Sequence, residues 1–256
     1  MAIEVFNRFE HKFLFSKETY HKVLEVMDAH MVLDSHNPNY EPYTIANIYY
    51  DTPDDYLIRR SLEKPVYKEK LRLRAYGVPD TDAKVFLEIK KKYNGLVNKR
   101  RTTLKLFEAY DFVSTGIPPA PKEYMNLQVL REIEYFLKRY DLYPKLYLAY
   151  DRVAYFEKDN PDLRISFDIN IRSRRENVRP DYGDAGVQLL PPDIYLMEIK
   201  TSRAMPLWLA GMINEMGIKR KSFSKYGTEF KRYSNSPDYS ADILNFTKEI
   251  KEKIAI

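Results

Sequence analysis

Cysteine is absent from this chain of 256 residues. Its absence excludes disulfide bonds, zinc sites built on thiolates and cysteine nucleophiles, and it is typical of a reducing compartment. The four histidines do not show the spacing of a metal site. Neither of the common phosphate-binding loops occurs, because the chain contains no GxxxxGKS, GxxxxGKT or GxGxxG sequence. Chemistry that depends on these residues or loops is therefore not indicated.

Long hydrophobic runs are also absent. No stretch approaches the ~18 apolar residues of a membrane span, and the N-terminal sequence MAIEVFNRFEHKFLF has charges where a signal peptide has its apolar core. The net charge of +5 is too small to indicate nucleic-acid binding by itself. We therefore expect a cytoplasmic protein with no membrane span in this chain and no nucleic-acid partner.

The chain is rich enough in apolar side chains to form a core, with 44% hydrophobic and 14% aromatic residues. Strand-like patterns dominate, in about eight segments: 5–15, 43–51, 66–76, 83–93, 96–106, 145–157, 163–171 and 193–202. Helical periodicity appears in 16–29, with Ser16 as the expected N-cap, and in 124–140, 205–216 and 239–255. We found no repeat and no clear domain boundary. The sequence predicts one α+β domain over residues 1–256, built on a mostly antiparallel sheet, with the helix at 239–255 packed on its outside.

Most of the strand-like segments carry charge on one face. In EKLRLRAYG (69–77), Arg72 and Arg74 are two positions apart and point to one face, whereas Leu71 and Leu73 point to the other. The pattern recurs in other segments, where Arg and Lys outnumber the acids and Ser, Thr and Gln are sparse. A sheet with one face in water would also alternate in this way.

A closed barrel would place these charges inside the protein. About eight strands suffice for a barrel whose interior holds side chains and a small ligand. Cations that face inward repel one another at low effective dielectric, so an anion would have to lie among them. Arginine forks suit phosphate oxygens, and the few carboxylates would neutralise neighbouring cations or hold a hard divalent metal.

Several motifs occur together in a characteristic order: RFEHKF (8–13), YYDT (49–52), LRLRAYG (71–77), FLEIKKK (86–92), YDRVAY (150–155), LRISFD (163–168), MEIK (197–200) and FSKY (223–226). Together they resemble the VTC domain, the catalytic domain of vacuolar transporter chaperone complexes and of related bacterial proteins, which belongs to the triphosphate tunnel metalloenzymes. The resemblance covers roughly residues 3–232. It implies a closed antiparallel β-barrel of eight strands, decorated with helices, around a tunnel that holds polyphosphate or a nucleoside triphosphate.

The resemblance also implies an activity, the transfer of the ATP γ-phosphate to a growing polyphosphate chain with Mn²⁺ or Mg²⁺. It implies that ATP and polyphosphate or tripolyphosphate are the partners. By the same resemblance, Glu198 in MEIK is the metal ligand. The expected catalytic residues are Lys12, Arg72, Arg74, Lys90, Arg152, Arg164 and Glu198. The expected substrate-binding residues are Glu10, Lys99, Tyr150, Lys200, Ser224 and Lys225.

Two other functions stay open at the level of sequence. A tripolyphosphatase or triphosphate hydrolase in the same tunnel would need a carboxylate that orients water, for which Glu10 is the candidate. A polyphosphate-binding module would keep the cations without turnover, although Glu198 argues against it because anion binding alone has little use for a metal ligand. A polymerase needs no dedicated base, since its acceptor is a phosphate oxygen that is already ionised.

Overall fold

The computed structural model describes residues 9–94, 96–202 and 204–237. Its strands are β1 (Phe9–Ser16), β2 (Met31–Leu33), β3 (Tyr43–Asp51), β4 (Tyr67–Tyr76), β5 (Lys84–Tyr93), β6 (Leu96–Lys105), β7 (Tyr143–Glu157), β8 (Arg164–Arg174), β9 (Val187–Gln188) and β10 (Ile194–Thr201). Its helices are α1 (Lys17–Met27), α2 (Tyr56–Leu62), α3 (Leu106–Thr115), α4 (Leu127–Arg139), α5 (Leu207–Glu215) and α6 (Lys225–Ser234), with short 3₁₀ turns at Pro38–Tyr40 and Pro180–Tyr182. None of the helices in these ranges is long and apolar enough to cross a membrane.

The strands form one antiparallel sheet in the order β1-β10-β8-β7-β3-β4-β5-β6, with β2 added at β7 and β9 at β8. The α+β class and the large antiparallel sheet are therefore confirmed. The prediction that eight strands close into a barrel is wrong, because no pairing of β1 with β6 is found among the described residues.

The free edge of β1 has a different partner. Phe13 forms an isolated antiparallel bridge with Arg220, and the Lys221 amide donates to the Lys12 carbonyl at 2.8 Å. The chain segment that leads into α6 thus occupies the edge that β6 would need in a closed barrel. A paired edge also exposes fewer free backbone groups to other chains.

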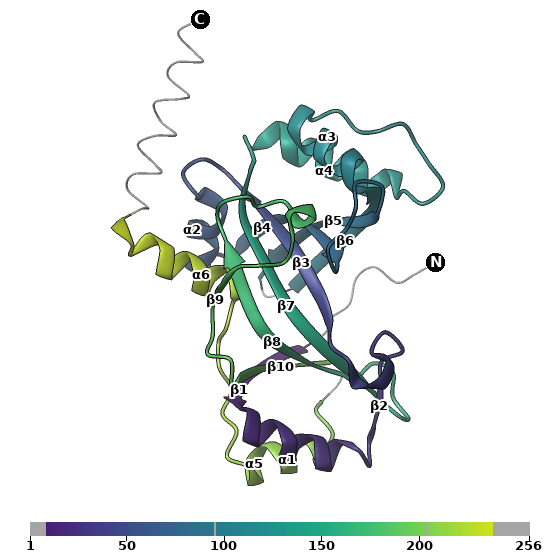
Figure 1. The fold of residues 1–256 in the computed structure, drawn as a ribbon, viewed down its shortest axis with the longest axis vertical. Coiled ribbons are helices and arrows are strands. Elements are labelled where there is room, and N and C mark those ends of the chain that lie inside the picture. Colours follow the sequence, from purple (N-terminus) through teal and green to yellow (C-terminus); the bar gives the residue numbers. More distant parts are fainter. Residues whose placement is uncertain (1–8, 95, 203, 238–256) are drawn as a thin grey trace, which may run out of the picture.

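Two helix pairs cover the outer face of the sheet, at opposite ends (Figure 1). Helices α3 and α4 pack on the apolar side of β3 to β6, where Leu73, Leu87, Phe112 and Ile133 share one core. Helices α1 and α5 contribute to a second core on β1, β7, β8 and β10. These two cores explain why most apolar residues of the strands point outward, toward helices, and the charged residues inward.

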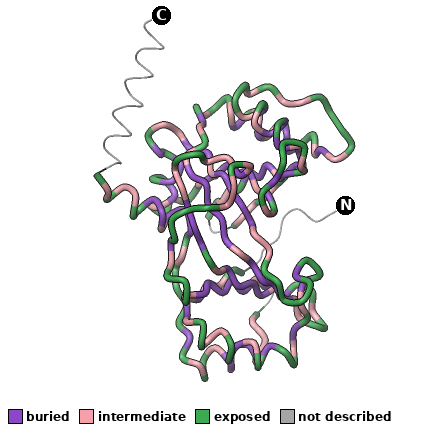
Figure 2. The backbone as a smooth tube through the Cα atoms, in the orientation of Figure 1, coloured by how far each residue is buried: buried purple, intermediate pink, exposed green. Residues whose placement is uncertain are grey.

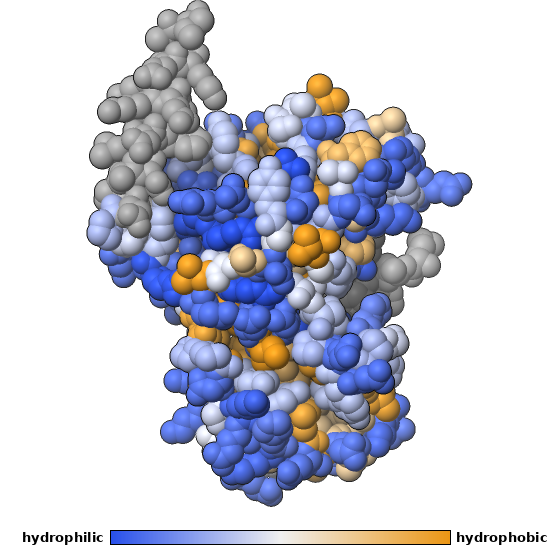
Figure 3. Space-filling model, viewed as in Figure 1, coloured by the Kyte–Doolittle hydropathy of each residue, from blue (hydrophilic) through white to orange (hydrophobic). Residues whose placement is uncertain are grey.

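The third core lies on the inner side of the sheet. There Ile45, Leu148 and Leu196 pack with Tyr226 and Phe230 of α6. Helix α6 therefore covers one end of the charged face. Figure 2 shows the buried residues concentrated along the central strands, and the face seen in Figure 3 is mainly hydrophilic, with small separate hydrophobic patches.

The sequence placed most elements correctly. Strand β3 has the expected bounds, and the other seven long strands agree within a few residues over their described parts. Ser16 caps α1 as expected, since its side chain accepts a hydrogen bond from the Thr19 amide. Helices α2 and α3 and the short strands β2 and β9 were missed. The expected helix at 239–255 lies outside the described residues.

Candidate functional site

The charged side chains share one face of the sheet, which we call the inner face. Strand register places Arg72 opposite Glu88, Lys12 opposite Glu198, and Arg152 opposite Asp168, so each pair projects to the same side. The sheet also curves strongly, because Lys90 on β5 interacts electrostatically with Glu10, Lys12 and Lys200 on β1 and β10 at the far end of the sheet. The inner face therefore forms a concave, basic surface, although the barrel is not closed by hydrogen bonds.

One group of charges centres on the buried Glu198. Its carboxylate lies 3.2 Å from the Nζ atoms of Lys12 and Lys225, 3.4 Å from Arg152 and 3.5 Å from Lys200. Burial opposes ionisation of Glu198, but these cations outweigh it and hold the pKa of the carboxyl well below its ordinary value. Glu198 is thus a fixed negative charge that holds four cations in place.

Asp168 supports the same group from β8. It accepts two hydrogen bonds from Arg152, at 2.6 and 2.8 Å, and a third from Lys225. The aromatic ring of Tyr150 lies 4.3 Å from the Lys225 ammonium and 5.1 Å from the Arg152 guanidinium. Lys225 comes from the first turn of α6, so these contacts attach that helix to the inner face.

A second group centres on the buried Glu88. Arg72 donates two hydrogen bonds to it, at 2.5 and 3.1 Å, and Lys99 lies 2.7 Å away. Arg74 is more distant, at 3.7 Å, and its buried Nε atom has no hydrogen-bond partner within the described chain. Burial opposes ionisation of Glu88, but these cations lower its pKa. Three cations thus share one carboxylate, which leaves excess positive charge for an anion.

Lys70 and Lys90 lie on the inner face and have no ion pair among the described residues. Burial, with repulsion from Lys68 and Lys90, lowers the pKa of Lys70 to about 7. Burial also lowers the pKa of Lys90. Burial and the nearby arginines lower the pKa of Lys99 to about 7, although Glu88 acts to raise it. The ammonium forms of these lysines are incompletely compensated, so a phosphate chain would stabilise them.

The expected site residues differ in their surroundings. Arg164 lies opposite Lys200 on the inner face and pairs with Asp34 at 3.0 Å. Glu10 is exposed and contacts Lys12 at 3.1 Å. Ser224 is the N-cap of α6, where its hydroxyl accepts from the Gly227 amide. Ser224 thus stabilises the start of α6, and its expected contact with phosphate stays a prediction.

The carboxylates fit a divalent metal only in a restricted sense. In the described part of the chain, no three His, Asp or Glu side chains lie together as a metal site. Glu10 and Glu198 are diagonal neighbours on β1 and β10, with oxygen donors that suit Mg²⁺ or Mn²⁺. Each is already compensated by lysine. One or two carboxylates are typical of metals that bind together with substrate phosphates, which would supply the remaining ligands.

The family model for the VTC domain matches residues 7–233. The chain belongs to the VTC domain family. Membership implies a substrate that contains phosphate, in agreement with the basic inner face. A search of curated proteins found no match.

Solved structures of other proteins share this fold at low sequence identity. A candidate adenylate cyclase from Bacillus halodurans is 15% identical, with a TM-score of 0.52 over 87% of this chain and 96% of that one. A Hippeastrum protein, described as a candidate adenylyl cyclase with a dominant triphosphatase activity, is 17% identical, with a TM-score of 0.51 over 89% of this chain and 97% of that one. These similarities concern the fold alone.

Three inner-face residues were not among the expected site residues of this VTC domain: Lys70, Glu88 and Asp168. The period of two places each of them on the charged face, so the signal was present in the sequence. What the alternation could not reveal is which carboxylate each cation meets, since that depends on strand register.

The lowered pKa values predict proton uptake when phosphate binds. Near pH 8, Lys70 and Lys99 are mainly neutral in the free protein, and an anion beside them raises their pKa. The unmodified protein should therefore take up protons when it binds tripolyphosphate. Lys70→Met should take up fewer protons on binding than the unmodified protein, by up to about one. Calorimetry at pH 8 in buffers of different ionisation enthalpy measures this number. Equal uptake by both proteins would contradict the lowered pKa of Lys70.

Proposed function

We propose that this VTC domain is a metal-dependent polyphosphate polymerase that transfers the γ-phosphate of ATP to a growing polyphosphate chain. The observation that carries the proposal is the concave inner face, with more cations than acids. Its remaining positive charge suits a chain of phosphates, and its arginine forks suit phosphate oxygens.

The state of the acids favours transfer to phosphate over hydrolysis. Glu88, Asp168 and Glu198 are buried and ion-paired with two or more cations each. Their lowered pKa values make them poor acceptors of a proton from water. A terminal phosphate oxygen is ionised already and needs no base, so a site without a free base can still lengthen a polymer.

The inner-face residues would act by position and charge. Arg72, Arg74 and Lys99 would hold the phosphates on the β4–β6 side, and Arg152, Lys200 and Lys225 on the opposite side. Glu198, with Glu10 beside it, would hold the metal jointly with substrate oxygens; the metal, when bound, withdraws negative charge from the transferring phosphoryl group. The rigid carboxylate contacts keep the cations in place before substrate arrives.

Triphosphate hydrolysis is the second candidate, because Glu10 differs from the other acids. It is exposed, and within the described part of the chain its ion pair is with Lys12. A carboxylate of this kind could orient an attacking water molecule. Burial opposes its ionisation, but Lys12 and Lys200 lower its pKa, which weakens it as a base.

Incubation of the purified protein with ATP and Mn²⁺ or Mg²⁺, followed by gel separation of products, tests the proposal. We expect a ladder of polyphosphate with the unmodified protein and a weaker ladder with Glu10→Gln, because one of the two carboxylates proposed to hold the metal loses its charge. Free phosphate without polymer, lost in Glu10→Gln, would establish hydrolysis. Tripolyphosphate binding without either product would indicate a binding module and contradict the proposed enzyme.

A further inference from the structure

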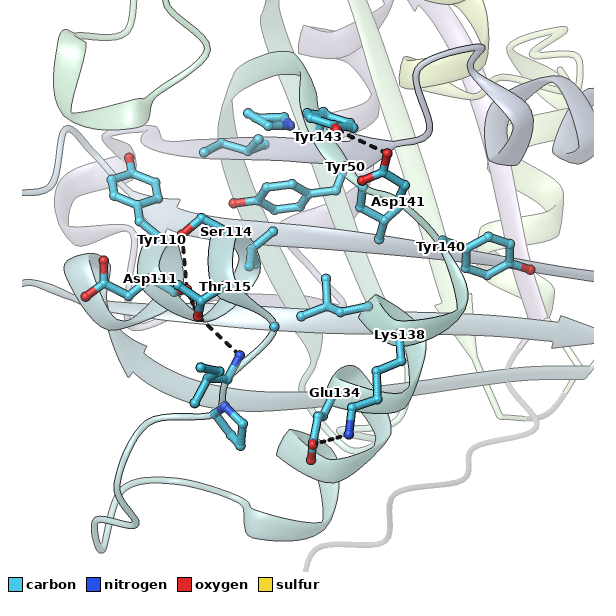
Figure 4. Close-up of a pocket in the computed structure, with 18 of the residues that line it drawn as sticks. Tyr50, Tyr110, Asp111, Ser114, Thr115, Glu134, Lys138, Tyr140, Asp141 and Tyr143 are labelled. Atoms are coloured by element: carbon cyan, nitrogen blue, oxygen red, sulfur yellow. Dashed lines mark hydrogen bonds and ion pairs between the residues drawn. The ribbon is translucent and has the colours of Figure 1, made fainter. Parts of the chain in front are cut away.

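A cavity of about 830 Å³ lies on the outer face, away from the charged inner face. It is bounded by the C-terminal halves of α3 and α4 and by β3 and the start of β7 (Figure 4). Its walls are mainly apolar and aromatic, with Ile48, Val113, Leu137 and Leu142 among them. A volume of this size and such a lining are typical of sites for small organic ligands.

Strand β3 separates this cavity from the inner face. Ile48 and Tyr50 line the cavity, whereas Tyr49, between them, accepts a hydrogen bond from Arg72 on the inner face at 3.3 Å. The pairing of β3 with β7 shifts register between Tyr49 and Tyr50. The cavity is therefore a site distinct from the inner face and shares only a wall with it.

The Tyr50 hydroxyl is a polar group inside this cavity without a protein partner. The residue is 3% exposed, and its hydroxyl forms no hydrogen bond within the described chain. In Figure 4 its ring extends from β3 toward α3, with the oxygen on the side of Tyr110. Burial raises its pKa, so it is a neutral hydroxyl that can donate or accept. The hydroxyl is not among the buried polar atoms without a partner in the described chain, so its oxygen is open to the cavity, where a ligand could bind it.

The charges around the cavity favour a cation. Lys138 is paired with Glu134 at 2.6 Å and Arg179 with Asp181 at 2.6 Å, so both cations of the lining are compensated. Asp111 and Asp141 also line the cavity, and neither has a cationic partner in the described ranges. Unlike the inner face, this site has an excess of negative charge.

The C-terminal ends of α3 and α4 also favour a cation in this cavity. Helix α3 ends at Thr115 and α4 at Arg139, and both contribute their last turns to the cavity. The C-terminal end of a helix carries partial negative charge, which attracts cations.

We propose that this cavity binds an organic amine, that is, a protonated amino group on an apolar, aromatic body. The body would fill the space between α3, α4 and β3, with a polar edge at the Tyr50 hydroxyl and the ammonium near Asp141. Asp111, on the opposite side of the cavity, adds to the negative charge around it. Phosphate-containing molecules are excluded by the same charges. The proposal concerns a second site and does not depend on the reaction proposed for the inner face.

A matched pair of probes tests it, tryptamine and indole-3-propionate, which share an indole ring and differ in charge. Saturating tripolyphosphate is present throughout, so that the carboxylate probe does not bind the inner-face cations. By calorimetry at low salt, we expect tryptamine to bind at least about tenfold more tightly. Tyr50→Phe removes one hydrogen bond to the indole N–H and should weaken both probes by about two- to tenfold.

The acidic residues are tested separately, with a control. Asp111→Asn combined with Asp141→Asn should reduce the preference for tryptamine to about twofold or less, whereas Asp159→Asn, in an exposed turn, should leave it unchanged. Both aspartates are exposed, so this variant tests the proposal even if Tyr50→Phe fails to fold, which thermal melting reveals. Equal binding of the two probes, or a preference that survives the double substitution, would overturn the proposal.

Discussion

Glu198→Gln is expected to lower ATP-dependent polymer synthesis by a factor of about 10² to 10³ while tripolyphosphate binding is retained. Glutamine keeps the shape and one carbonyl oxygen but removes the negative charge proposed to hold the metal. The phosphate contacts come from Lys and Arg, which the substitution leaves in place. Polymer synthesis measured with Mn²⁺, together with calorimetric binding of tripolyphosphate, separates the two effects.

The surroundings of Glu198 add a second expected result. The loss of its charge leaves Lys12, Lys225 and Arg152 close together with only part of their compensation. Removing one member of a buried ion-pair group destabilises a protein by about 3–5 kcal/mol. Without ligand, the melting temperature of Glu198→Gln should therefore be lower than that of the unmodified protein. Tripolyphosphate should raise the melting temperature of Glu198→Gln by more than it raises that of the unmodified protein, because the anion replaces the missing charge.

Asp168→Asn is the matched control. It removes the same charge from the same group, since Asp168 also binds Arg152 and Lys225, but it is not the proposed metal ligand. We expect it to lower stability as Glu198→Gln does and to retain far more turnover. Wild-type synthesis in Glu198→Gln would show that the metal assignment is wrong. An equal loss of turnover in both variants would assign Glu198 to charge balance alone.

Much of the fold could be predicted from the sequence because strand alternation is a local property. Leu71, Arg72, Leu73 and Arg74 alternate, and the structure places the leucines in an outer core and the arginines on the inner face. Local periodicity carries this information without any knowledge of neighbouring strands. The inference that the charged face points inward followed from the same pattern repeated over several strands.

Closure of the barrel could not be predicted, because it depends on contacts between distant segments. The edge of β1 is taken by Arg220 and Lys221, more than 200 residues further along the chain, through backbone atoms that carry no sequence signal. The same limit applies to Lys225 and Asp168, which are 57 positions apart.

Arg74→Ala is expected to weaken both binding and synthesis, unlike Glu198→Gln. The Arg74 side chain is 12% exposed, lies 3.7 Å from Glu88 and keeps its Nε atom without a partner in the described chain. Glu88 is held more closely by Arg72 and Lys99, at 2.5 and 2.7 Å, so it stays compensated when Arg74 is removed. The substitution should therefore affect the ligand more than the fold.

The size of the effect follows from the loss of charged hydrogen bonds to phosphate. At about 1.5–3 kcal/mol, such contacts correspond to a rise of about tenfold to a hundredfold in the Kd for tripolyphosphate. The salt dependence of binding should also become shallower, because one cation fewer meets the anion. Arg131→Ala, an exposed arginine of α4 on the outer side, is the control and should change neither quantity. The Kd is measured by calorimetry at two salt concentrations. An unchanged Kd in Arg74→Ala would place the phosphate chain away from the β4–β5 side of the inner face. A chain bound there would contact Arg74, because Glu88 leaves the charge of this guanidinium largely uncompensated.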